Sequence, residues 1–246
     1  MTTGDPRALR SAAAHVFVDD LEAPRLSQDD RHHLERVLRL RRGQAVTVAD
    51  GAGGWRCCRW GRDAALEPVG EVVRSPAPSP PVTVGFALTK GERPEWVVQK
   101  LTEVGVDRIV ILVAARSVVR LDEETAGRRV QRWRRVAREA AMQSRRTSLP
   151  ELEGVLPLAG ATAVDGAAAG AVLAEPGGLA LSLERPVMVG PEGGWAPEEL
   201  ALGHATVDLG PNVLRAETAA VAAGVLLCSL RTGLVMERGA SPREPL

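Results

Sequence analysis

Two short motifs near the C-terminus combine residue types that could build a ligand site largely from backbone. Residues 190–195 read Gly-Pro-Glu-Gly-Gly-Trp after the apolar run 186–189, and residues 209–220 begin Leu-Gly-Pro-Asn-Val-Leu-Arg. Each pattern predicts a strand that ends in a Gly/Pro turn and opens a helix. Because ligands of open α/β sheets bind outside the carboxyl ends of the strands, two such turns side by side would suit a flat, polar small molecule.

The first turn lacks the common phosphate-binding patterns. No Gly-Lys-Ser/Thr follows it, and Gly-x-Gly-x-x-Gly is absent. Glu192 lies inside the turn and would repel an anion, so the motif favours a cationic, hydroxylated or amine-bearing ligand. A tight turn that binds nothing would have the same composition, so both interpretations stay open here.

Arg215 and Glu217 follow the second turn. Arginine keeps its charge and could stabilise a developing oxyanion, with Glu217 paired to it. The alternative is a helix N-terminus held by an Arg–Glu pair. No Ser/His/Asp set and no carboxylate pair at fixed spacing support a hydrolase, and the three cysteines lack the spacing of a zinc site.

Composition places the chain among ordinary globular proteins. It has 246 residues, 45% of them apolar and 25% charged, with no apolar signal core at the N-terminus. The longest apolar stretch, 216–230, is too short to span a bilayer, so we expect no membrane contact. Three cysteines without a disulfide framework favour a reducing cytoplasm, and the absence of Cys/His spacing leads us to expect no metal. Basic charge gathers in residues 31–62 and 128–146, which could face an anionic polymer or could reflect arginine-rich codon usage.

The proline-rich stretch 75–81 predicts a stiff linker between two domains. Before it, strands are expected at 15–18, 45–49, 54–60 and 71–73, with a short helix capped by Ser27, which fits a small barrel. After it, strands at 82–88, 108–113, 171–174, 187–189 and 205–209 alternate with helices at 94–105, 126–144 and 215–231. The sequence therefore predicts an α/β fold with a mainly parallel sheet and domains 1–74 and 82–246.

Five linked motifs resemble the bacterial 16S ribosomal RNA (uracil-N3)-methyltransferase family. They are residues 90–106, 116–120, 139–146, 190–194 and 209–219, in the family's order and spacing. The resemblance implies a methyltransferase of the SPOUT class with a deep trefoil knot, a PUA-like N-terminal barrel that binds RNA, and a homodimer through the knotted domain. It also implies S-adenosylmethionine as cofactor and a uridine near the 3′ end of 16S rRNA in the 30S subunit as substrate.

For the methylation of uracil N3 that the resemblance implies, Arg215 and Glu217 are the expected catalytic residues. Arg215 would stabilise the uracil anion, and Glu217 would orient Arg215 or take part in proton removal. The implied cofactor residues are Leu173, Glu175, Gly190, Pro191, Glu192, Gly194, Leu209, Gly210, Val213 and Leu214. RNA phosphates are expected to bind Arg116, Arg120, Arg145 and Arg146, together with Arg36, Arg39, Arg41 and Arg42 in the small N-terminal domain.

Two other functions fit the same motifs. The chain could be an RNA-binding or assembly factor that keeps the knotted fold without turnover, or a SPOUT methyltransferase acting on another RNA such as tRNA. Asn212 stands where the family often has a basic residue, so the contacts at that position are expected to differ.

Overall fold

The computed structural model describes residues 5, 7–163, 165–202 and 205–236. Contacts divide the chain into two compact units. Unit 1 comprises Met1–Ala77 with Arg138–Leu149, and unit 2 comprises Pro78–Ala137 with Pro150–Leu246. The break at residue 77 lies within the proline-rich stretch 75–81.

Unit 1 is built on a four-stranded sheet in the order β1-β2-β3-β4. The strands are β1 (Ala14–Phe17), β2 (Ala45–Ala49), β3 (Gly54–Trp60) and β4 (Leu66–Arg74); β1 and β2 are parallel and the other pairs antiparallel. Short helices accompany the sheet: α1 (Arg7–Ser11), α2 (Gln28–His32), the π-helix η1 (His33–Val37) and the 3₁₀ turn η2 (Arg62–Ala64). As predicted, Ser27 caps α2, because its hydroxyl accepts a hydrogen bond from the Asp30 amide at 3.0 Å.

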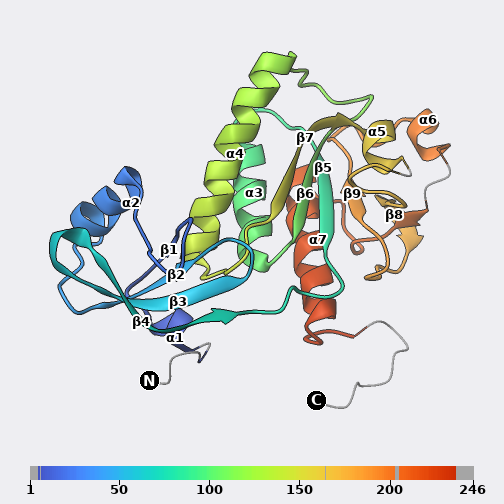
Figure 1. Cartoon of the computed structure of the whole chain (residues 1–246). Coiled ribbons are helices and arrows are strands. Elements are labelled where there is room, and N and C mark those ends of the chain that lie inside the picture. The colour runs from blue at the N-terminus through green and yellow to red at the C-terminus, as the bar shows by residue number, and fades with distance from the viewer. Residues whose placement is uncertain (1–4, 6, 164, 203–204, 237–246) are drawn as a thin grey trace. The chain divides into compact units, whose positions relative to one another are not determined.

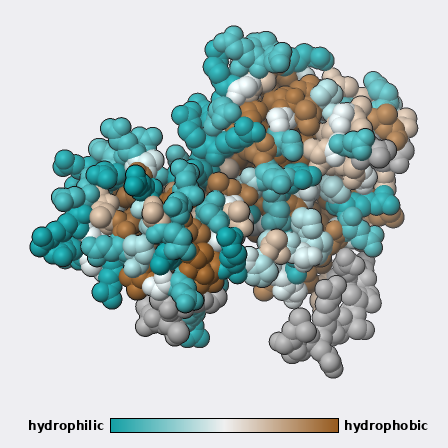
Figure 2. All heavy atoms as spheres, in the orientation of Figure 1, coloured by the Kyte–Doolittle hydropathy of each residue, from teal (hydrophilic) through white to brown (hydrophobic). Residues whose placement is uncertain are grey.

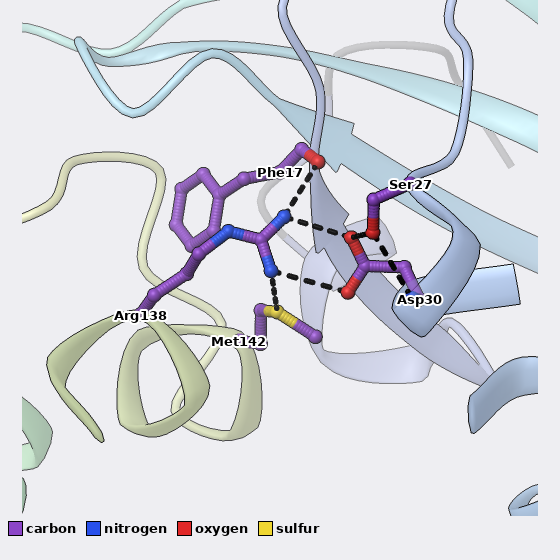
Figure 3. A network of polar contacts seen from close by, with 5 residues as sticks. All are labelled: Phe17, Ser27, Asp30, Arg138 and Met142. Atoms are coloured by element: carbon purple, nitrogen blue, oxygen red, sulfur yellow. Dashed lines mark hydrogen bonds and ion pairs between the residues drawn. The ribbon is translucent and has the colours of Figure 1, made fainter. Parts of the chain in front are cut away.

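The second segment of unit 1 contains the C-terminal end of helix α4 (Glu123–Gln143). Arg138 from this helix grips Asp30 with two nitrogens, at 2.9 and 3.1 Å, and donates to the carbonyl of Phe17 at 3.0 Å (Figure 3). Burial opposes the charged form of Asp30, but hydrogen bonds from Arg138 and Ser27 outweigh it and hold the pKa of this carboxyl below its usual range. The bidentate pair therefore fastens residues 138–149 to the N-terminal segment.

Unit 2 is a six-stranded parallel sheet in the order β10-β8-β9-β5-β6-β7 (Figure 1). Its strands are β5 (Thr83–Ala87), β6 (Arg108–Val113), β7 (Glu151–Pro157), β8 (Val172–Leu179), β9 (Val187–Val189) and β10 (Thr206–Val207). Besides the first part of α4, its helices are α3 (Arg93–Val104), α5 (Leu158–Thr162), α6 (Pro197–Leu200) and α7 (Ala216–Arg231). The predicted α/β fold with a mainly parallel sheet is confirmed; β7 was not predicted.

Side chains of the parallel strands alternate between two hydrophobic clusters. Ile109 and Ile111 of β6 pack with residues of α3, α4 and α7, whereas Val110 and Leu112 pack with α5 and Trp195. The sheet is thus covered on both faces, which explains why its central strands read as continuous apolar runs. Hydrophilic side chains cover the N-terminal end of α4, at the top of Figure 2.

Helices α3 and α7 pack closely on the same face, and α7 also contacts β5 and β9. α3 ends at Gly105, whose φ of +102° is the left-handed conformation expected for a helix-ending glycine. No helix in the described ranges is long and apolar enough to cross a membrane. Within those same ranges, His, Cys, Asp and Glu form no group of three or more placed to hold a metal ion.

Candidate functional site

A cavity of about 400 Å³ opens in unit 2 where the two turn motifs leave the sheet. Its walls come from the middle of β8, from the ends of β9 and β10 and the loops that follow them, and from the start of α7. The lining residues are Ala174, Glu175, Pro176, Val189, Gly190, Pro191, Glu192, Gly194, Trp195, Asp208, Leu209, Gly210, Asn212, Val213, Leu214, Arg215, Ala216 and Ala219. The volume lies within the usual range of sites for small molecules and cofactors.

The first loop depends on glycine at two positions. A Cβ on Gly190 would lie 3.1 Å from the ring of Trp195, which is buried and donates its indole N–H to the carbonyl of Ala174 at 3.1 Å. Gly194 has φ of +69°, a conformation that side chains rarely adopt, and its amide closes the turn onto Pro191 O at 2.8 Å. The indole therefore ties the loop after β9 to β8.

Asp208 organises the second loop. Its carboxylate accepts hydrogen bonds from the amide of Gly210 at 2.9 Å and from that of Gly177 at 3.1 Å. These amides stabilise the ionised form and hold the pKa of Asp208 below its usual range. Gly210, with φ of +133°, makes the bend that this arrangement needs.

The charges around the cavity are arranged differently from the sequence expectation. Glu217 does not pair with Arg215; its Oε1 lies 3.6 Å from Nε of Arg93, whose Nη1 binds Oε1 of Glu192 at 3.0 Å. Residues two apart at a helix start do not share a face, which explains why Arg215 and Glu217 diverge. Arg215 is exposed, lines the cavity, and has no ion-pair partner within the described part of the chain.

The cofactor residues implied by the motifs gather around this cavity with one exception. Leu173 is fully buried in the cluster on the α5 face of the sheet, and its neighbour Ala174 lines the cavity instead. Glu217 is not among the lining residues, although Ala216 and Ala219 on either side of it are. Arg93 was not singled out, although it lies within the motif 90–106 that supports the family resemblance.

The arginines expected to bind RNA are divided between the units. Exposed Arg36, Arg39, Arg41 and Arg42 belong to unit 1, with Arg145 and Arg146. Arg145 is half-buried and donates to the carbonyl of Ala12 at 3.0 Å; burial lowers its pKa. In unit 2, Arg116 donates to Gly193 O at 2.9 Å, and Arg120 is exposed.

Comparisons with known proteins show the family of the chain. Residues 76–227 match the family described as RNA methyltransferase domain. Ribosomal RNA small subunit methyltransferase E of Mycobacterium tuberculosis is 37% identical over 220 residues, which cover 79% of this chain and 82% of the relative. The chain belongs to this methyltransferase E family. The family resemblance inferred from the five motifs is therefore confirmed.

Solved structures give the same result. A putative methyltransferase of Legionella pneumophila in complex with the bound cofactor SAM is 26% identical, with a TM-score of 0.74 over 87% of this chain and 96% of that one. Ribosomal RNA small subunit methyltransferase E of Neisseria gonorrhoeae bound to S-adenosyl methionine is 28% identical, with a TM-score of 0.71 over 88% and 97%. The fold of this methyltransferase family thus extends over most of the chain.

The cavity of this methyltransferase fits S-adenosylmethionine chemically. Gly190 and Gly194 line the cavity without a side chain, while Leu209 and Leu214 offer apolar surface to a flat base. Glu175 and Asp208 line the same cavity and suit a cationic sulfonium. Because Arg93 already balances Glu192, the acidic character falls mainly on Glu175 and Asp208.

Proposed function

We propose that this protein methylates N3 of a uridine near the 3′ end of 16S rRNA, within the small ribosomal subunit, using S-adenosylmethionine. The observation that carries the proposal is that the two turn motifs line one cavity together with Arg215. Neither motif has the sequence pattern of a common phosphate-binding loop. The relatives named as small-subunit rRNA methyltransferases support S-adenosylmethionine-dependent methylation of ribosomal RNA.

The reaction sets clear requirements on the protein. Uracil N3 carries a proton and is a poor nucleophile until that proton leaves, and the charge then spreads onto O2 and O4. When bound, S-adenosylmethionine supplies an electrophilic methyl carbon, and its sulfonium becomes a neutral thioether as the N3–carbon bond forms. Because N3 lies on the pairing edge, the base must be unpaired or flipped before it can enter.

Two residues at the start of α7 answer these requirements. Arg215 lines the cavity with an exposed guanidinium that is free to bind the O2 or O4 of a uracil anion. Glu217, in the first turn of α7, would accept the N3 proton or orient the base. Glu175, Gly190, Pro191, Glu192, Gly194, Leu209, Gly210, Val213 and Leu214 would hold the cofactor.

The proposal extends to the architecture. The loops after β9 and β10 would form a trefoil knot, and the sheet of unit 1 would be a PUA-like barrel that uses its exposed arginines to bind RNA phosphates. Two chains would pair through the knotted domain, in the cytoplasm where ribosomes assemble. Sedimentation analysis should give a mass near twice 26.1 kDa; a single 26.1 kDa species at micromolar concentration would contradict the dimer.

The Arg215→Ala variant tests the chemistry. We expect its single-turnover rate on 30S subunits to fall about 10²- to 10³-fold, because one stabilising group for the developing charge is lost. Calorimetry should show unchanged affinity for S-adenosylmethionine. Arg185→Ala, which removes another exposed arginine of unit 2 that does not line the cavity, is the matched control and should keep full activity.

Nucleoside mass spectrometry distinguishes the alternatives. Ribosomal RNA from a deletion strain should lose N3-methyluridine, and purified protein should restore it on 30S subunits. Methylation of tRNA instead would show a different substrate. RNA binding without any affinity for S-adenosylmethionine would show an assembly factor without turnover.

A further inference from the structure

We propose that Arg93 is a positioning residue of the methyl-transfer site, which holds the carboxylates of Glu192 and Glu217 on one guanidinium. This inference rests on the proposed function, because Glu217 is assigned there to proton removal or base orientation. It adds a residue from a third element, α3, to a site otherwise built from strand ends and α7.

The geometry joins parts that are about a hundred residues apart in sequence. Nη1 of Arg93 lies 3.0 Å from Oε1 of Glu192, in the loop after β9. Nε of the same side chain lies 3.6 Å from Oε1 of Glu217, in the first turn of α7. Since Glu192 lines the cavity and Glu217 lies between two lining residues of α7, one side chain fixes two walls of the site.

The contribution of Arg93 to the stability of the fold gives little reason for a positive charge at this position. Arg93 is 45% exposed and Glu192 is 46% exposed, and an ion pair with such exposure contributes little to folding. Glu217 is 15% exposed, but its carboxylate lies 3.6 Å from the guanidinium and makes no hydrogen bond to it among the described contacts. Arg93 is also the first residue of α3, where the helix dipole disfavours a positive charge. The arrangement is therefore better explained by the alignment of the two carboxylates than by stabilisation of the fold.

Glu217 supplies an independent observation. Its Oε2 is buried and has no hydrogen-bond partner among the described residues, while Oε1 faces Arg93. A buried carboxylate oxygen without a partner is costly, and in native proteins such atoms often belong to functional sites. Because Arg93 engages Oε1, a further proton or donor group at this carboxylate would have to bind Oε2.

Arg93 also sets the charge of the cavity wall. It balances Glu192, so a cationic ligand meets the carboxylates of Glu175 and Asp208, neither of which forms an ion pair with another described residue. Loss of Arg93 would leave an extra negative charge on the loop after β9. The affinity for a sulfonium cation should then stay the same or rise, whereas Glu217 would lose its alignment.

The test compares Arg93→Ala, Arg93→Lys, Glu217→Gln and the double variant Arg93→Ala/Glu217→Gln. Single-turnover methylation of 30S subunits should fall about 10²-fold in Arg93→Ala, because a misplaced group costs that much. The KM for 30S subunits should change little, and calorimetry should show S-adenosylmethionine bound no more weakly. Arg93→Lys should restore part of the rate, and the double variant should be no slower than the slower single variant.

Arg132→Ala is the matched control. It removes the cation that lies 2.9 Å from Glu95, a carboxylate in the same first turn of α3, and should leave the rate, the cofactor affinity and the melting temperature unchanged. The inference is overturned if Arg93→Ala turns over like wild type, if cofactor affinity falls in parallel with the rate, or if the two substitutions act additively. Absence of methylation by the wild-type protein would instead overturn the proposed function, and the inference with it.

Discussion

His15 is a buried histidine held by hydrogen bonds at both ring nitrogens. Nε2 donates to the carbonyl of Arg146 at 2.8 Å, so Nδ1 accepts from the hydroxyl of Thr47 at 2.8 Å. Burial lowers the pKa of His15 from 6.5 to about 4; the hydrogen bond to Arg146 opposes this shift, and the charge of Arg145 adds to it. The folded protein therefore holds this ring neutral where the unfolded chain would bind a proton.

This shift predicts a loss of stability on acidification. Between pH 6.5 and about 4 the unfolded chain binds more protons at His15 than the folded protein does, so the free energy of unfolding rises with pH across this window. The contribution amounts to about 3 kcal/mol between its two limits. Urea unfolding at pH 7 and pH 4.5 should show a smaller loss for His15→Gln than for wild type.

The control for this measurement is His32→Gln, which changes an exposed histidine of the same unit. It should follow the pH dependence of wild type. Equal slopes for wild type and His15→Gln would contradict the assignment of the acid sensitivity to His15.

At single positions, sequence patterns predicted side-chain type better than side-chain direction. Motif matching placed Leu173 at the cofactor, but successive residues of a strand face opposite sides, and here Ala174 faces the cavity. The alternation is invisible in a strand that is apolar on both faces. The role of Arg93 was not predicted, because its two partners lie 99 and 124 residues away in sequence and no local pattern indicates such contacts.

At the scale of elements, the contact of α3 with α7 depends on a glycine. A Cβ on Gly224 would lie 2.6 Å from Cδ2 of Leu101 and 3.2 Å from Cγ2 of Val106. Gly224→Ala should therefore destabilise the protein by about 1–3 kcal/mol through overpacking, despite the better helix propensity of alanine. Thermal unfolding measures the effect.

Gly127 in α4 offers the opposite case within the same unit. Nothing lies within 4 Å of a Cβ added there, so Gly127→Ala should stabilise the protein by up to about 1 kcal/mol. If both alanine variants shift the melting temperature in the same direction, close packing of α3 on α7 does not explain the need for glycine at position 224.

The order of strands and helices was largely readable because buried parallel strands and amphipathic helices have distinct periods. β7 was missed because it is an edge strand in which Glu151, Glu153 and Gly154 interrupt the apolar pattern. Its pairing with β6, from Arg108↔Glu151 onward, is a tertiary contact across some 40 residues. No local signal in the sequence encodes such a contact.

At the scale of the whole molecule, unit 1 is discontinuous. Its sheet comes from the first 77 residues, but Arg138, Ala141 and Met142 complete its packing around Phe17 and Trp55. Backbone hydrogen bonds from Gly53 to Thr147 and from Leu149 to Gly51 add to this closure. A boundary drawn from composition could locate the proline-rich stretch but not this returning segment.

Residues 1–77 expressed alone should therefore not fold stably. Loss of Arg138 leaves the buried carboxylate of Asp30 without its main partner, a cost of about 1–3 kcal/mol before any lost apolar contact is counted. Circular dichroism should show no cooperative melting for 1–77, whereas 1–77 joined to 138–149 by a flexible linker should melt cooperatively. Equal melting of both chains would contradict the need for the second segment.

The bond between Arg138 and Asp30 also determines when unit 1 can complete its folding during synthesis. The N-terminal sheet leaves the ribosome first, yet its fastening segment ends at residue 149, some 72 codons later. At about 5–20 residues per second, the nascent sheet waits roughly 4–14 s with Phe17 and Trp55 uncovered. During that interval a protein that modifies ribosomes would itself present an unfinished apolar surface to the chaperones around the ribosome that is making it.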